Sequence, residues 1–219
     1  TTEGQYYTLS ELKEAIKANQ TDKNDTLVVL YAQNKEQQYT AIEEAKAKGY
    51  QVLLLDSPIV SHLIQKLEDK NEKLTFARVD AAPLSKLIQK DEPILAKHSE
   101  EEKNTLKTDI EKVLPKEGYM VQIEDLDSDD TPFVINQPEF MRRMKEMSAT
   151  GGGGMFGAFP DMYHVVVNAN APLADAILAA DEAAKEKLIK QAFDLARLSQ
   201  GLLKGKELSE FVKRNWEIC

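Results

Sequence analysis

Two short runs of apolar residues constrain the fold of this chain more than any other feature. Residues 27–31 (Leu-Val-Val-Leu-Tyr) and 52–55 (Val-Leu-Leu-Leu) are apolar throughout, without alternation. Short continuous runs of this kind are typical of strands that are buried on both faces of a parallel sheet. A helical segment that ends at Gly49 separates them, and residues 76–79 form a weaker third candidate. We therefore expect a strand–helix–strand unit with a small parallel sheet.

Helical patterns flank these strands. Thr8 has a glutamate three residues after it, which predicts a capped helix over residues 9–18. A further helix of about ten residues is expected after Pro58, because proline favours the start of a helix. Its helical spacing predicts an inner face with four apolar residues. They are Ile59, Leu63, Ile64 and Leu67.

The rest of the chain has a different pattern. Residues 83–98 hold two prolines and indicate a connector. Beyond it we expect helices and strands in an α+β arrangement, in which residues 133–135 pair with the strand at 119–123. The other expected elements are a helix ending at Leu114, a strand at 164–168, and two long closing helices at about 183–203 and 207–218. The predicted fold class is α/β plus α+β, with domains at 1–82 and 99–219.

Composition and charge argue against several kinds of partner and location. The chain has 37 acidic and 28 basic residues, for a net charge of −9. Binding to nucleic acid or to an anionic membrane needs clustered cations, so neither partner is expected. No apolar run approaches the ~18 residues of a membrane span. The single cysteine, Cys219, cannot form a disulfide within the chain, which favours a cytoplasmic location.

Catalytic and metal-binding patterns are hard to find. The histidines at 62, 98 and 164 have no metal-ligand spacing, and the glycines at 151–154 follow a helix and lack the lysine of a phosphate loop. The acidic residues at 125–130 alternate, but they lack the glycine and final glutamate of a calcium loop, so a solvated loop is favoured over a calcium site. We expect no catalytic residue, cofactor or metal.

A cluster of methionines is the most unusual local feature. Phe140, Met144 and Met147 follow the spacing i, i+4, i+7 of one helical stripe, with Met141 beside it. Met155 and Phe156 follow the four glycines. Because methionine adapts to irregular partners, this stripe predicts a binding surface. An ordinary core helix is the alternative, although the neighbouring glycines would hold such a helix poorly.

The two closing helices carry a second apolar stripe. On the first helix its members follow a 4-3-4-3 spacing, and the last helix adds four more. The stripe consists of Leu188, Ala192, Leu195, Ser199, Leu202, Leu208, Phe211, Val212 and Trp216. Two such helices pack either on their own domain or against a second copy, and periodicity alone leaves both arrangements open.

Several stretches resemble, in order, the heat-shock protein 90 chaperones in their bacterial form. Residues 27–32 and 48–59 (Lys-Gly-Tyr-Gln-Val-Leu-Leu-Leu-Asp-Ser-Pro-Ile) are similar to the end of the middle domain. Residues 130–135, 138–144, 163–168 and 191–201 are similar to the C-terminal domain. The resemblance covers nearly the whole chain and rests on the order of these stretches.

The resemblance implies that the chain is the C-terminal piece of a longer protein. The start at Thr1 by itself fits processing or a removed tag equally well, and only the resemblance favours excision. The ATP-binding domain and the ATP-contacting arginine then lie outside it, so this fragment is not expected to be an enzyme. ATP and Mg²⁺ belong to the full-length protein. The acidic tail that recruits co-chaperones in eukaryotic members has no counterpart before Cys219, so partners of that tail are not expected.

Two binding functions follow from the resemblance. The terminal helices of the family form a homodimer through a four-helix bundle, which assigns the interface to Leu188, Ala192, Leu195, Leu202, Leu208, Phe211, Val212 and Trp216. Partly unfolded client proteins bind the family at a mobile amphipathic helix and at one helix of the middle domain. These sites correspond to Phe140, Met141, Met144, Met147, Met155 and Phe156, and to His62 and Gln65. The family often has an aromatic residue where this chain has His62.

Two other functions remain open. A small doubly wound enzyme would use Asp56 and Ser57, which follow the second strand, because ligands bind at the carboxyl ends of parallel strands. It needs a second catalytic group that the sequence does not reveal. An adaptor that dimerises without a client surface is the other alternative.

Overall fold

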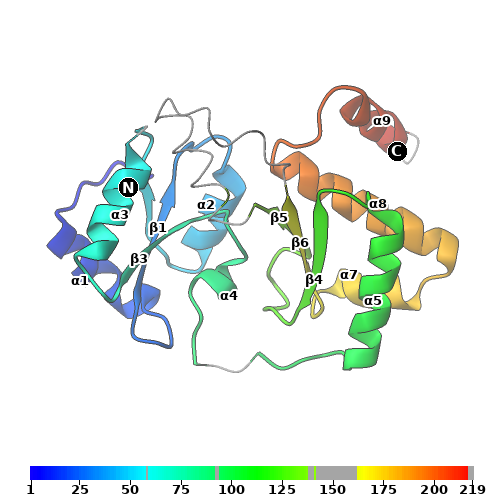
Figure 1. The fold of residues 1–219 in the computed structure, drawn as a ribbon, viewed down its shortest axis with the longest axis horizontal. Coiled ribbons are helices and arrows are strands. Elements are labelled where there is room, and N and C mark those ends of the chain that lie inside the picture. Colours follow the sequence, from blue (N-terminus) through cyan, green and yellow to red (C-terminus); the bar gives the residue numbers. More distant parts are fainter. Residues whose placement is uncertain (58, 92–93, 138–140, 142–161, 217–219) are drawn as a thin grey trace. The chain divides into compact units, whose positions relative to one another are not determined.

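The computed structural model describes residues 1–57, 59–91, 94–137, 141 and 162–216. They form two compact units, each with its own sheet (Figure 1). The first unit holds the described residues up to 91 together with Gln137 and Met141, and the second holds 94–136 and 162–216. The chain is therefore a mixed helix-and-sheet protein, as expected.

The first unit is built on a three-stranded parallel sheet. Its strands are β1 (Leu27–Ala32), β2 (Val52–Leu54) and β3 (Leu74–Arg78), in the order β2-β1-β3. Leu30 lies opposite Val52, and Val29 lies opposite Phe76. The predicted small parallel sheet is thus confirmed, with the first apolar run at its centre.

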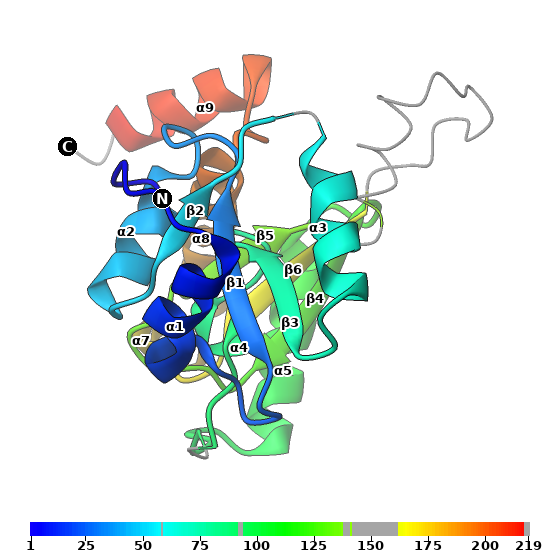
Figure 2. The same cartoon turned by 90° about the vertical axis from the view of Figure 1, so that its left-hand side faces the viewer.

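Helices cover both faces of this sheet (Figure 2). Val28, Leu30 and Ala32 of β1 join a core cluster with residues of α2 (Tyr39–Ala47) and α4 (Leu84–Leu87). The alternate residues, Val29 and Tyr31, join a second cluster with α1 (Leu9–Gln20) and α3 (Val60–Asp69). A strand that is buried on both sides needs apolar residues at every position, which explains the continuous run.

The start of α1 has the predicted capping box. The backbone N–H of Glu11 donates to the Thr8 hydroxyl at 3.3 Å, and the Glu11 carboxylate accepts from the Thr8 N–H at 2.8 Å. The helix runs to Gln20, two residues beyond the expected end. The buried Gln20 amide donates to the Val28 carbonyl at 2.9 Å and accepts from the Gln51 N–H at 2.6 Å, so it links α1 to two strand segments.

Helix α4 lies within the segment that was expected to be a connector. Leu84 and Ile88 are buried in the core of the first unit, and the N–H of Lys23 donates to the Gln89 carbonyl at 2.7 Å. The spacing of Leu84 and Ile88, four residues apart, was the signal available in the sequence. This part of the segment therefore belongs to the first unit.

The second unit has a mixed sheet with helices packed on it. Its elements are α5 (Glu100–Val113), β4 (Tyr119–Glu124), β5 (Phe133–Asn136), β6 (Tyr163–Asn168), α7 (Pro172–Ala179), α8 (Glu182–Ser199) and α9 (Gly205–Trp216). The expected pairing of residues 119–123 with 133–135 is wrong. β6 lies between them, parallel to β4 and antiparallel to β5. Residues 165–167 of β6 are all buried valines, as is typical of a central strand.

The core of the second unit lies between this sheet and three helices. Ile110 of α5, Ile177 of α7 and Ile189 of α8 are fully buried in one cluster with residues of all three strands. The rings of Tyr119 and Phe193 meet edge to face at 5.0 Å between their centroids. Helix α7, which was not expected from the sequence, thus contributes to the centre of this core.

Candidate functional site

Helix α3 presents two apolar side chains to solvent. Its inner face carries Val60 and Ile64, which are buried against β1 and β3. Ile59 and Leu63 were expected on that face, but they are 66% and 46% exposed. The expectation for these two residues is wrong, because the buried stripe begins one residue later, at Val60. The exposed pair is four residues apart and forms an apolar strip on the surface of the first unit.

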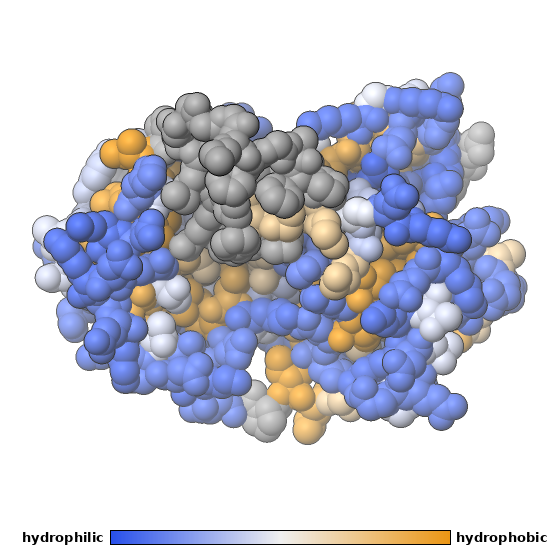
Figure 3. All heavy atoms as spheres, viewed as in Figure 1, coloured by the Kyte–Doolittle hydropathy of each residue, from blue (hydrophilic) through white to orange (hydrophobic). Residues whose placement is uncertain are grey.

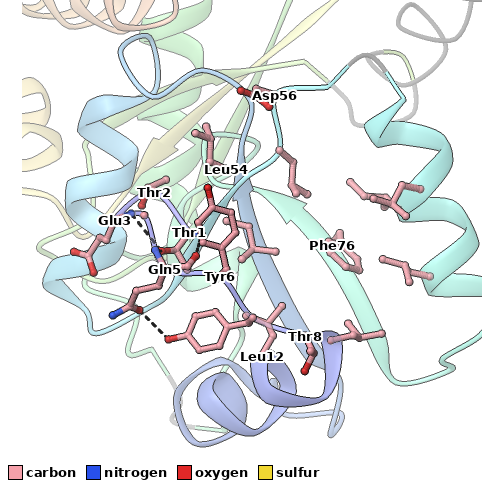
Figure 4. Close-up of a pocket in the computed structure, with 18 of the residues that line it drawn as sticks. Thr1, Thr2, Glu3, Gln5, Tyr6, Thr8, Leu12, Leu54, Asp56 and Phe76 are labelled. Carbon is pink, nitrogen blue, oxygen red and sulfur yellow. Dashed lines mark hydrogen bonds between the residues drawn. The ribbon is translucent and has the colours of Figure 1, made fainter.

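A cavity of about 760 Å³ lies beside this strip (Figure 4). Phe76 of β3 and Leu54 of the edge strand β2 line it from different sides in Figure 4, and Leu63 of α3 lines it as well. The N-terminal residues complete the wall, and the N–H of Thr2 donates to the Val52 carbonyl at 2.9 Å. Most of the exposed surface of the cavity wall is apolar.

The two predicted client-binding positions of this unit lie on the same helix. His62 and Gln65 are both exposed, and Leu63 between them lines the cavity. The structure thus brings the predicted residues next to an apolar strip that the sequence had placed in the core. The packing of α3 on the sheet was needed to show that this apolar strip faces solvent.

Asp56, one of the two residues on which the enzyme alternative depends, belongs to the wall of this cavity. Glu3 and Lys35 are the other charged residues among the described residues that line it. Among the described residues that line it, none is a histidine or a cysteine. General acid–base or nucleophilic chemistry needs a partner group within hydrogen-bond reach of the first.

Some of the predicted interface residues of α8 and α9 are buried in the core, and others are exposed. Ala192 and Phe211 are buried, whereas Leu195, Val212 and Trp216 are exposed. The remaining three, Leu188, Leu202 and Leu208, are half-buried. Leu188 and Leu202 pack against the core of the second unit. Leu198 is also exposed and was missed, although it follows Leu195 at helical spacing.

Polar contacts hold α9 against α8. Arg214 donates to Asp194 at 2.6 Å, and the Gln191 amide donates to Asn215 at 2.9 Å. A third contact joins Arg197 to Glu207, and its hydrogen bond lowers the pKa of the glutamate carboxyl. These contacts lie within one chain, so the two helices form a hairpin.

Most of the methionine segment lies outside the described residues. This holds for Phe140, Met144, Met147, Met155 and Phe156, so their role stays a prediction. Met141 is described, and it is half-buried.

Neither a metal cluster nor a membrane-spanning helix is found in the described part of the chain. No three of its histidine, cysteine or acidic side chains are grouped so that they could hold a metal ion. In the acidic loop, Asp125 instead pairs with Lys103 at 2.5 Å. None of the described helices is both long and apolar enough to cross a bilayer. The surface in Figure 3 is largely hydrophilic, with hydrophobic areas in several separate places.

Comparison with known proteins relates the chain to one group of chaperones. No family model matches it. It is 31% identical to the chaperone protein htpG of Bacteroides fragilis, over 99% of the chain and 42% of that protein. It is 37% identical to the chaperone protein HtpG of Porphyromonas gingivalis, over 84% of the chain and 28% of that protein. The HtpG of Bacteroides thetaiotaomicron is 30% identical over 99% of the chain.

The chain thus spans less than half the length of the relatives it matches. The alignment with the Bacteroides fragilis protein has 286 positions, more than the 219 residues of this chain, so that relative carries additional residues within the matched region. The chain matches the bacterial HtpG family of heat-shock protein 90 chaperones over nearly all of its length and corresponds to the C-terminal part of those proteins.

Proposed function

We propose that this chain is the C-terminal part of an ATP-dependent molecular chaperone, where it joins two subunits and helps to bind partly unfolded proteins. The observation that carries the proposal is the match to proteins named as HtpG chaperones along nearly all of the chain. The nucleotide, Mg²⁺ and the ATPase reaction are assigned to the part of the full-length protein that precedes this chain. The fragment acts by binding, in the cytoplasm, and its own residues break no bond.

The dimer part of the proposal is supported by the hairpin of α8 and α9. Its exposed apolar residues include Leu195, Val212 and Trp216, which a monomer would leave in water. If a second copy packed against this hairpin through the same surface, the exposed apolar residues of both copies would be buried in a symmetric contact. Light scattering is expected to give about twice the mass of one chain at micromolar concentration. A monomer at that concentration would refute this part.

The client-binding part is supported by the strip of Ile59 and Leu63 beside the apolar cavity. Partly unfolded proteins expose apolar side chains, and a strip next to a hollow offers them an adaptable surface. The methionine segment is proposed as a second such surface, on the strength of its composition.

Two double variants test the client surfaces separately. Ile59→Ser with Leu63→Ser is expected to weaken binding of a partly unfolded, fluorescently labelled protein by roughly 30-fold, since each exposed residue contributes about 1 kcal/mol when covered. Met144→Ser with Met147→Ser tests the methionine stripe. Lys66→Ser on the exposed face of α3 is the matched control. If both double variants bind as the control does, with the dimer intact, the chain is an adaptor without a client surface.

A further inference from the structure

Helix α3 does not bury the centre of its apolar side. That side consists of Ile59, Val60, Leu63, Ile64 and Leu67. The sheet buries one edge of it, where Val60 is 3% and Ile64 is 1% exposed, and leaves Ile59 and Leu63 at the surface. At 100° per residue, the centre of the five lies about 50° around the helix from the midpoint of Val60 and Ile64. Hydrophobic burial alone would therefore favour a rotated helix with Leu63 turned inward.

Glu68, in the last turn of α3, binds the sheet beside the buried edge. Its carboxylate accepts from the backbone N–H of Phe76 at 2.7 Å and from the Thr75 hydroxyl at 3.2 Å. Both residues belong to β3, which is an edge strand. The carboxylate thus binds the N–H of Phe76 in place of the carbonyl of a neighbouring strand.

This contact specifies the rotation of α3. Side chains reach ~5–6 Å from a helix axis, so a turn of about 50° would move the Glu68 carboxylate by about 5 Å. Both hydrogen bonds would then break, and the N–H of Phe76 would lose its charged acceptor. The contact therefore opposes the rotation that apolar burial favours.

The cavity of about 760 Å³ lies where the rotated helix would place its apolar residues. Leu63, Ile64 and Leu67 line it together with Phe76. Turning α3 toward the centre of its apolar side would carry Leu63 into this space. The exposed strip and the open cavity are thus two consequences of the same rotation.

We propose that Glu68 is a positioning residue, which holds α3 in the rotation that keeps Ile59 and Leu63 at the surface and the cavity open. This inference rests on the client-binding function proposed above. In that function, an apolar side chain of a partly unfolded protein covers the strip and fills the space that Leu63 would otherwise take. Glu68 acts through the orientation of α3 and not through contact with the client.

Cysteines at two neighbouring positions measure the rotation. In a Cys219→Ser background, Leu63→Cys is expected to react with a maleimide much faster than Ile64→Cys, because only the first position is exposed. Adding Glu68→Ala should slow the reaction at position 63 and accelerate it at position 64, each by roughly fivefold, because the rotated helix becomes populated. Acceleration at both positions would show a loosened helix and would overturn the proposal, as would unchanged rates.

Two further variants separate the hydrogen bonds from the charge. Asp69→Ala is the matched control, because it removes the same charge from the next residue of α3, which is exposed. Glu68→Gln keeps a side-chain oxygen that accepts from the N–H of Phe76. Both variants should therefore retain the reaction rates of the unchanged helix at positions 63 and 64. A shift in Glu68→Gln as large as in Glu68→Ala would refute the role of these hydrogen bonds.

Client binding tests the consequence of the rotation. With the labelled, partly unfolded protein, Glu68→Ala is expected to bind roughly fivefold more weakly than Asp69→Ala, and Glu68→Gln should bind as Asp69→Ala does. If Glu68→Ala binds normally while Ile59→Ser with Leu63→Ser binds weakly, the positioning role is wrong and the client surface stands. If that double variant also binds normally, the client surface on α3 is itself refuted, and the proposed role of Glu68 fails with it.

Discussion

Trp216 offers the sharpest test of the proposed subunit interface. It is 75% exposed at the end of α9. A tryptophan presents up to ~250 Å² of surface, so about 190 Å² is left to be covered by a partner. At ~25 cal/mol/Å², complete covering would contribute about 5 kcal/mol, and covering of about half contributes about 2 kcal/mol. A symmetric dimer has two such residues, so Trp216→Ser is expected to raise the dissociation constant by roughly 10³-fold.

Two comparisons separate an interface from a core in this experiment. Phe211 is only 8% exposed, with the Arg214 guanidinium 5.6 Å from its ring centre, so Phe211→Ala should loosen the docking of α9 itself. Trp216→Ser should leave the thermal unfolding of the diluted monomer unchanged. Lys213→Ser is the matched control on the exposed surface of α9.

Sedimentation equilibrium from nanomolar to micromolar concentration measures all three dissociation constants. We expect a large change in the dissociation constant for Trp216→Ser with an intact α9, and a change for Phe211→Ala that is accompanied by faster amide exchange along α9. If Trp216→Ser dimerises as tightly as Lys213→Ser, the exposed face of α9 is not at the subunit contact.

Three further changes test the physical account of each unit. Asp109 is buried and bonded to Lys185 at 2.8 Å, which lowers its pKa. Asp109→Asn should therefore cost about 1–2 kcal/mol in urea unfolding at pH 7. This loss should shrink as the pH falls through the unfolded-state pKa of about 4 and below, because the folded-state pKa lies lower still; a constant difference down to pH 2 would contradict the assignment. Ile64→Ala removes a fully buried side chain and should destabilise the first unit by about 2–5 kcal/mol, and a cost below 1 kcal/mol would refute its core position. Thr8→Ala should cost about 1 kcal/mol through the loss of the α1 cap, measured by urea unfolding against the exposed control Glu14→Ala.

Local sequence was sufficient to predict an element where a single physical requirement determines its residues. The run at 27–31 has no polar residue, so it predicted a strand that is covered on both faces, and β1 is buried between two layers of helices. The capping box at Thr8 and the glycine after α2 were also predictable, because each depends on a few neighbouring residues. Gly49 has a φ of +75°, which favours glycine.

The candidate sites were less predictable, because the spacing of apolar residues does not show whether the core, a partner or solvent covers them. Leu63 and Ile64 are adjacent, and only the packing of α3 shows that the second is buried and the first lines a cavity. Periodicity likewise left open whether the apolar stripe of α8 and α9 packs on its own domain or against a second copy. The structure places Ala192 in the core and Leu195 at the surface, within one turn of each other.

Contacts between distant residues could be found only in the tertiary structure. The pairing of β6 between β4 and β5 depends on competition among all three strands for the central position, and no single strand encodes it. Asn170 is an unremarkable loop residue in the sequence, yet it binds backbone groups more than 70 residues away. Local patterns in the sequence predicted most of the secondary structure and the family resemblance. The exposed surfaces and the contacts of Asn170 were decided by the tertiary structure, because both depend on which distant segments meet.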